Sequence, residues 1–232
     1  MMKKRLWSRW ILALAVVWPF MAAAHDRVRE KENFDFDWKF ILNADDQANA
    51  GMQVSETGWQ DVQLPHDWSI SQNFDPKLSG SNGHLPGGIG WYRKMFRVDK
   101  KDKGRRIAVL FDGIYSRSDV YVNGQHLGFR PYGFCYQEYD LTPYLNYGAE
   151  NVLAVRVNNP LEHDSVARWY TGAGIYRHAW LVKTAEVHVA SYGTYVTTPV
   201  VTAERAEVRV RTSVANEAER TKTLSVRQQI TD

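Results

Sequence analysis

The sequence predicts an all-β protein, with a sandwich or jelly roll first and the beginning of an immunoglobulin-like sandwich after it. Short runs of alternating apolar and polar residues recur at a spacing of roughly 8–12 residues, separated by Gly, Pro and Asn. No amphipathic helix of about ten or more residues is recognisable. From about Glu186 the runs become longer and alternate more plainly, which predicts a second domain.

The first 24 residues have the three-part layout of a secretory signal peptide. A basic start precedes an apolar run at 10–21 and three alanines at 22–24. This run of roughly 12 residues is shorter than the about 20 that cross a bilayer. We therefore expect an exported protein, periplasmic or secreted, with an uncleaved N-terminal anchor as the alternative.

The next residues lead into the first strands. Residues 25–32 are charged and predict a loose lead-in, after which Trp38, Phe40 and Leu42 alternate as a strand would. A second apolar run at 59–64 ends at a proline. Residues 71–90 are rich in Gly, Ser, Asn and Pro, which predicts a long surface excursion.

The most regular part of the pattern lies between residues 91 and 184. Residues 91–98 alternate as a strand with one core face, and 105–114, 150–159 and 175–184 predict further strands. Residues 136–145 predict a short strand followed by a Thr-Pro turn. Between the predicted strands, Asn123-Gly124 separates two short alternating runs. Both residues tolerate the positive φ angles of a two-residue hairpin turn, so a β-hairpin is expected there.

Three alternating runs, at 186–198, 205–216 and 220–232, follow the change of pattern. An immunoglobulin-like sandwich needs about seven strands and about 100 residues. We therefore expect residues 186–232 to be the first strands of a truncated sandwich with an open sheet edge.

Charge and cysteine content exclude several classes of function. The formal charge is +3, but residues 1–24 hold four Lys or Arg and no acid, so the remainder is 3 − 4 = −1. A near-neutral chain has no general attraction for nucleic acid or anionic lipid, so neither is expected as a partner. Cys135 is the one cysteine, which excludes an intramolecular disulfide. We expect it to be a small core residue rather than a nucleophile.

Phosphate, metal and hydrolase motifs are also missing from the sequence. In the G-x-G of Gly172 and Gly174, a dinucleotide fingerprint would place a third glycine at position 177, which is arginine. The histidines lack the spacings of a zinc site, so neither a metal nor a cofactor is expected. The acids Asp61 with Asp67, or Glu162 with Asp164, could flank a glycosidic bond, but solvated loop acids are the favoured interpretation.

Several segments together resemble a known family. They are "WKF", "VQLPHDWSI", "HLPGGIGWYRKMFRV", "VLFDGIYSRSDVYVNGQHLGFRPYGFCYQEYDLTPYL", "ENVLAVRVNN" and "SVARWYTGAGIYRHAWL", in this order. The set resembles the N-terminal part of family 2 glycoside hydrolases, most closely the β-galactosidase-like members. The resemblance covers roughly residues 33–232, although each piece alone would be weak.

The resemblance implies an architecture and a function. Residues 33–185 would be a jelly-roll, galactose-binding-like sugar-binding domain, and 186–232 the start of the immunoglobulin-like domain. In the family a TIM barrel follows and carries both catalytic glutamates of a retaining β-glycosidase. No barrel is present in this sequence, so no catalytic residue is assigned and the chain alone is expected to be inactive. The alternatives are a stand-alone, lectin-like carbohydrate-binding module and an adhesion or assembly domain that binds no sugar.

The family's sugar contacts map onto one loop. The resemblance places Arg168, Trp169 and Tyr170 at the rim of a sugar pocket, with Asp164, five residues before the tryptophan, as a further candidate. These residue types suit a sugar, because an aromatic ring stacks on its apolar face and a guanidinium supplies several donors to its hydroxyls. The alternative is that Trp169 packs in the core and Arg168 braces the loop.

Overall fold

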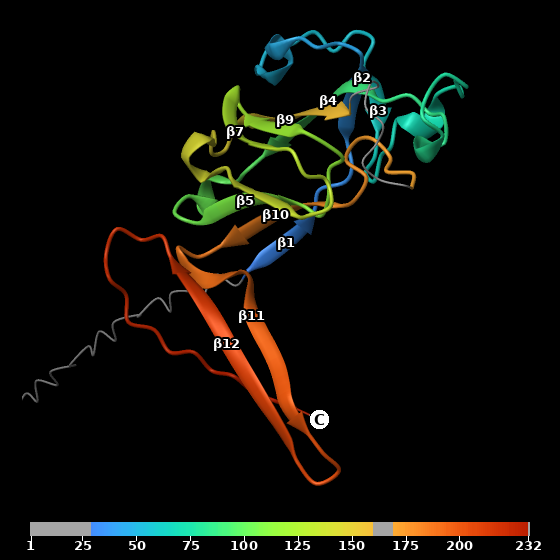
Figure 1. Ribbon diagram of the computed structural model, residues 1–232. Helices are drawn as coiled ribbons and strands as arrows, with labels where there is room; N and C mark the ends of the chain where they lie inside the picture. Colours follow the sequence, from blue (N-terminus) through green and yellow to red (C-terminus); the bar gives the residue numbers. More distant parts are fainter. Residues whose placement is uncertain (1–28, 160–168, 232) are drawn as a thin grey trace, which may run out of the picture.

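The structure is a computed structural model that describes residues 29–159 and 169–231. The predicted signal peptide and the candidate residues Asp164 and Arg168 lie outside the described residues. Two sheets form a sandwich, and a separate two-stranded hairpin extends away from it (Figure 1). The six-stranded sheet has the order β3-β2-β4-β9-β6-β7, and the four-stranded sheet has the order β1-β10-β5-β8. The predicted all-β sandwich fold is thus confirmed.

The described residues form twelve strands and five short 3-10 turns. The strands are β1 (Glu30–Asn33), β2 (Trp38–Leu42), β3 (Gln60–Val62), β4 (Gly88–Arg97), β5 (Arg106–Phe111), β6 (Ser118–Val122), β7 (Gln125–Arg130), β8 (Gln137–Asp140), β9 (Glu150–Asn159), β10 (Ala179–Thr184), β11 (Val187–Val201) and β12 (Ala206–Asn216). Five 3-10 turns connect them, namely η1 (Gln47–Ala50), η2 (Ser69–Ser71), η3 (Gly80–Asn82), η4 (Lys100–Asp102) and η5 (Thr142–Tyr144). Among the residues that the structure describes, no helix has the length and hydropathy that crossing a bilayer requires.

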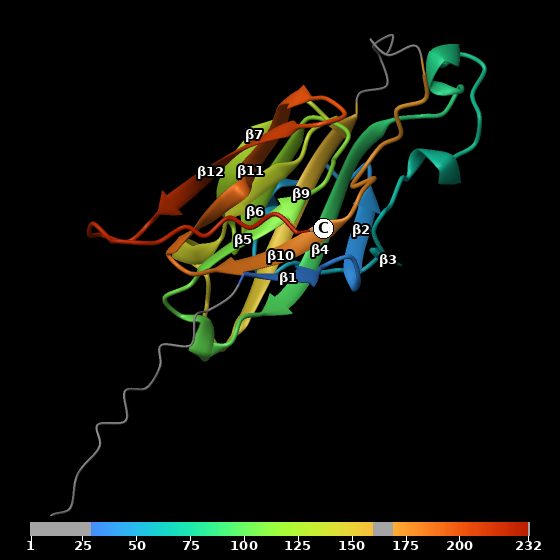
Figure 2. The ribbon, with the colours of Figure 1, turned by 90° about the horizontal axis from the view of Figure 1, so that it is seen from below.

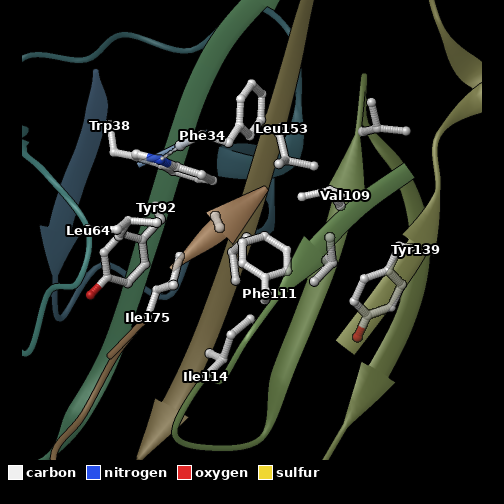
Figure 3. Close-up of a cluster of buried hydrophobic side chains, with 14 of the residues drawn as sticks. Phe34, Trp38, Leu64, Tyr92, Val109, Phe111, Ile114, Tyr139, Leu153 and Ile175 are labelled. Carbon is white, nitrogen blue, oxygen red and sulfur yellow. Dashed lines mark hydrogen bonds between the residues drawn. The ribbon is translucent and has the colours of Figure 1, made fainter. Parts of the chain in front are cut away.

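The hydrophobic core lies between the two sheets of the sandwich. Figure 2 shows β1 and β10 of the smaller sheet lying over β4 and β9 of the larger one. Trp38, Tyr92 and Phe111 are fully buried there and meet edge to face or tilted (Figure 3). Burying an aromatic or branched side chain of this size contributes about 1.5–3 kcal/mol to stability. The apolar residues of the alternating runs that predicted the strands therefore face this core, and the residues between them face outward.

Strand β4 differs from its prediction, because both of its faces are buried. Tyr92 points to the core, but Trp91 and Arg93 on the opposite face are also almost completely buried. Their cover includes the turn Gln47–Ala50 and the residues after it, whose carbonyl oxygens bind the Arg93 guanidinium. The prediction of a single core face was wrong because a loop forms a second, smaller layer outside the sheet.

The Asn123-Gly124 hairpin is confirmed. It joins β6 to β7, and its two central residues have φ angles of 50° and 84°, as a two-residue turn of the mirror-image type requires. Asn123 also contributes contacts beyond the turn. Its side chain donates to the Asn151 carboxamide oxygen at 2.8 Å and accepts from the Val152 amide at 2.9 Å. The turn is thus anchored to β9.

Two smaller expectations were wrong. The end of the predicted loose lead-in forms β1, which pairs with β10 in antiparallel register from Glu30 opposite Lys183. All four side chains of β1 are exposed, so no apolar alternation signalled a strand. Cys135 is half-exposed rather than a core residue, since it lies on the connection before β8, where its thiol contacts the Tyr132 carbonyl.

The long runs after Glu186 form one hairpin of β11 and β12. The third predicted strand, at 220–232, is wrong for the described residues 220–231, which contain no strand. The hairpin contacts the sandwich through the Arg106–Glu217 ion pair at 3.0 Å and the rings of Tyr136 and Tyr192, 4.6 Å apart. Much of its apolar surface is exposed, including Val196 and Val201.

This exposed hairpin leads to a solubility prediction. A long strand with unpaired edge groups and exposed apolar side chains is a template for association with other chains. A shortened chain that ends at Thr184 is therefore expected to stay monomeric at higher concentration than the full chain in sedimentation velocity. If the shortened chain aggregates more, the predicted boundary between residues 185 and 186 is misplaced.

Candidate sugar-binding site

The candidate site lies on the segment that joins β9 to β10. Trp169 and Tyr170 open the described part of this segment and are 60 % and 40 % exposed. The residues that follow, Thr171 to Ile175, are buried, and Ile175 points into the core next to Tyr92 and Phe111 (Figure 3). The segment therefore presents two aromatic rings on a fixed base, and Trp169 does not pack in the core.

Asp67 fixes the position of Tyr170. The tyrosine hydroxyl donates to one carboxylate oxygen of Asp67 at 2.5 Å, while the other oxygen accepts from the Ala173 and Ser69 amides at 3.0 and 2.9 Å. Burial, reinforced by this hydrogen bond to the carboxylate, raises the pKa of the Tyr170 phenol. Tyr170 thus remains a neutral donor held in one orientation.

The long excursion at 71–90 supports the same segment from the other side. The side-chain oxygen of Asn82, in the turn η3, accepts from the Thr171 amide at 3.3 Å and from the Thr171 hydroxyl at 3.2 Å. The excursion is confirmed as a connection without strands over residues 71–87, whereas 88–90 already belong to β4. It anchors Thr171, the residue next to the exposed aromatic pair.

The two glycines of the segment allow close approach of the chain to its neighbours. Gly172 has a φ of 74°, and a Cβ there would lie 2.8 Å from an Asp67 oxygen. Gly174 has a φ of 122°, and a Cβ there would lie 2.3 Å from the Tyr92 hydroxyl. Both positions favour glycine for backbone reasons and for space. The G-x-G spacing thus serves packing, in agreement with the exclusion of a phosphate loop.

His66, Asp67 and Trp68 pair with the backbone of the segment that contains these glycines. The His66 amide donates to the Ile175 carbonyl at 2.8 Å and the Trp68 amide to the Ala173 carbonyl at 3.1 Å. The Trp68 ring is buried against Phe40. His66 and Asp67 therefore belong to a structural turn next to a buried tryptophan. Sequence analysis missed that this turn also holds Tyr170 in place through Asp67.

His66 makes stability depend on pH. Its ring nitrogen Nδ1 lies 2.8 Å from the Tyr92 hydroxyl, and burial lowers the pKa of His66 below its ordinary value of 6.5, against a smaller opposing effect of Asp67. The imidazole of His66 therefore binds a proton more tightly in the unfolded chain than in the folded chain. The contribution of neutral His66 to the free energy of unfolding is complete above pH 6.5 and is lost as the pH falls below that value. Urea unfolding between about pH 7.5 and 5 should show a larger decrease in the free energy of unfolding for the wild type than for His66→Gln. If the free energy of unfolding falls equally with pH in the two proteins, His66 is not the group responsible.

The acid pairs considered for catalysis do not come together where the structure describes them. Asp61 forms an exposed ion pair with Lys39 at 2.6 Å, whereas Asp67 is engaged with Tyr170. Glu162 and Asp164 lie outside the described residues. Within residues 29–159 and 169–231, no group of His, Cys, Asp and Glu has a geometry that could hold a metal ion.

Comparison with known proteins identifies the family. The family model described as the sugar binding domain of glycosyl hydrolases family 2 matches residues 32–185. The chain belongs to glycosyl hydrolase family 2. The resemblance read from the ordered motifs is thereby confirmed, and the sandwich described above is the family 2 sugar-binding domain.

Individual family 2 relatives agree with this assignment. A Bacteroides ovatus protein named beta-galactosidase BoGH2A is 46 % identical over 201 residues, which are 85 % of this chain and 23 % of the relative. A beta-glucuronidase of Formosa agariphila is 33 % identical over 231 residues, 88 % of this chain and 23 % of the relative. The crystal structure of a family 2 member from Bacteroides cellulosilyticus DSM 14838 has a TM-score of 0.70 at 43 % identity and covers 81 % of this chain and 25 % of that one. The chain spans about a quarter of the length of the relatives it matches.

Proposed function

We propose that the chain binds a terminal β-galactoside-like sugar at Arg168, Trp169 and Tyr170, with Asp164 as a further contact. The observation that carries the proposal is the exposed pair Trp169 and Tyr170 on the surface of a family 2 sugar-binding domain, with Tyr170 held by Asp67. An immobilised aromatic ring stacks on the apolar face of a sugar at little cost in conformational entropy. A galactoside is favoured by the 46 % identity to a protein named a beta-galactosidase, and the protein named a beta-glucuronidase makes a glucuronide the alternative.

Calorimetric titration with galactose, lactose and glucuronic acid tests this proposal. Binding with a Kd around the millimolar range is expected for lactose, and Trp169→Ala or Arg168→Ala should abolish the measurable heat. Phe129→Ala is the matched control, because Phe129 is an exposed aromatic residue on β7, 51 % exposed against 60 % for Trp169, and lies outside the candidate site. Lactose binding that is unchanged in Trp169→Ala would refute the assignment of the site.

A second part of the proposal concerns catalysis. The chain would act as the N-terminal sugar-binding portion of a retaining β-glycosidase whose two catalytic glutamates lie on a TIM barrel outside this sequence, and that barrel would be its partner. Purified chain is expected to leave a nitrophenyl β-galactoside intact, at the rate of a protein-free blank. Turnover well above the blank would contradict this part and leave the binding proposal standing.

Export completes the proposal. The signal-peptide layout of residues 1–24 supports a periplasmic or secreted protein. The alternative function, a stand-alone exported lectin-like module, uses the same aromatic loop. It is distinguished by affinity, because a self-sufficient module should bind lactose clearly more tightly than millimolar without any catalytic partner.

A further inference from the structure

A strip of aromatic side chains continues from the candidate site across the surface of the sandwich. The Phe134 ring centroid lies 6.4 Å from that of Trp169, 5.8 Å from that of Tyr132 and 5.1 Å from that of Tyr115. Tyr132, Phe134 and Trp169 are 61 %, 43 % and 60 % exposed. We call Tyr115, Tyr132, Phe134 and Trp169 the aromatic strip.

The loop that carries Tyr132 and Phe134 is held rigidly. The Tyr176 hydroxyl donates to the Gly133 carbonyl at 2.9 Å, and a Cβ on Gly133 would lie 2.4 Å from the Tyr115 ring. The loop is thus fastened to the end of the candidate segment and packed directly on the strip itself. Rings that are exposed and yet fixed lose little entropy when a ligand stacks on them.

The strip is also fastened to the backbone of the candidate site. The Tyr115 amide donates to the Gly174 carbonyl at 2.9 Å, and the Gly174 amide donates back to the Tyr115 carbonyl at 2.8 Å. Tyr115 and the two exposed rings of the candidate segment therefore share one framework. A ligand that occupies the Trp169 and Tyr170 end would find the rest of the strip in a fixed place beyond it.

An arginine backbone lies next to the strip. Arg117 follows Tyr115 by two residues, is exposed, has a φ of 46°, and its amide contacts the carbonyl of Pro131, next to Tyr132. Within the part of the chain that the structure describes, no hydrogen bond or ion pair is recorded for its guanidinium. The backbone of Arg117 thus lies next to the loop that carries Tyr132, and its guanidinium has five N–H donors.

We propose that Phe134 and Tyr132 of the aromatic strip bind the second and following units of a β-linked oligosaccharide whose terminal sugar lies at Trp169 and Tyr170. A sugar unit has an apolar face for Phe134 or Tyr132 and hydroxyls at its edge for water and Arg117. A row of rings suits such a chain of units better than a single sugar. This inference rests on the proposed function and adds to it that the ligand is a glycan chain.

Calorimetric titration with a length series tests the inference on the full chain. The probes are galactose and β-1,4-linked galactobiose, galactotriose and galactotetraose. The Kd is expected to fall by about three- to tenfold from galactose to galactotriose, the gain of one or two ring contacts. Phe134→Ala should remove this gain and leave the Kd for galactose unchanged, whereas Phe129→Ala should preserve the gain.

The outcomes separate this inference from the function on which it rests. Binding of galactose without any gain from length overturns the inference alone. Absence of binding by all four sugars overturns the inference together with the proposed function. A gain that persists in Phe134→Ala also overturns it. If Phe134→Ala changes no titration but lowers the mass observed in sedimentation, the strip is a contact between copies of the chain and the inference is wrong.

Discussion

Gly174→Ala is expected to lower the free energy of unfolding by about 3 kcal/mol or more. The added Cβ would lie 2.3 Å from the Tyr92 hydroxyl and 2.7 Å from the His66 carbonyl oxygen, at a φ of 122° that side chains rarely adopt. Tyr92 is fully buried and cannot move without disturbing Trp38 and Phe40. Steric overlap and backbone strain therefore add.

Urea unfolding of the wild type, Gly174→Ala and Gly58→Ala measures this effect. Gly58 is the matched control, since it also has a positive φ, 84°, but no atom lies within 4 Å of an added Cβ. Only the backbone strain of about 1 kcal/mol applies there. Equal losses in the two variants would show that close packing at Gly174 does not shape the segment.

Arg93→Met is expected to cost about 3–5 kcal/mol of folding free energy. The guanidinium is 1 % exposed and donates to the Asn49 and Gly51 carbonyls at 2.5 and 2.6 Å. It also pairs with Glu56 at 3.3 Å. Methionine would fill much of the space but leave these partly buried oxygens without a donor.

The control is Arg97→Met, at the exposed end of the same strand β4, where the change should stay within about 0.5 kcal/mol. The loss of folding free energy in Arg93→Lys should lie between these two values. The lysine ammonium keeps the charge but, unlike the planar guanidinium, cannot donate to several separate carbonyls at once. A loss in Arg93→Met no larger than in Arg97→Met would contradict the role of Arg93 as the anchor of the outer layer.

The strands were predictable where one face meets the core. Leu153, Val155 and Val157 alternate along β9 and are buried, so a period of two identified the strand. The Asn-Gly turn was predictable because its requirement for positive φ is local. Strand β1 was not, since its side chains are all exposed and it is held by main-chain pairing with β10.

The site was predictable only in part. The motif around Trp169 and Tyr170 is local and was found, but Asp67 lies 103 residues before Tyr170, and no local pattern links them. The same holds for Phe134, which meets Trp169 only through the fold. Arg93 shows the opposite failure, because arginine is usually exposed and its burial depends on carbonyls that the sequence does not reveal.

The tryptophan indole N–H signals in a ¹H–¹⁵N NMR titration with lactose test the central claim most directly. Trp169→Phe assigns one signal, and this signal is expected to shift as lactose is added. The signals of the buried Trp38 and Trp68, and of Trp180, whose indole donates to Asp112, should stay in place. Two results would contradict a sugar-binding site at this loop. Either lactose shifts other signals and leaves the Trp169 signal in place, or it shifts no signal at all.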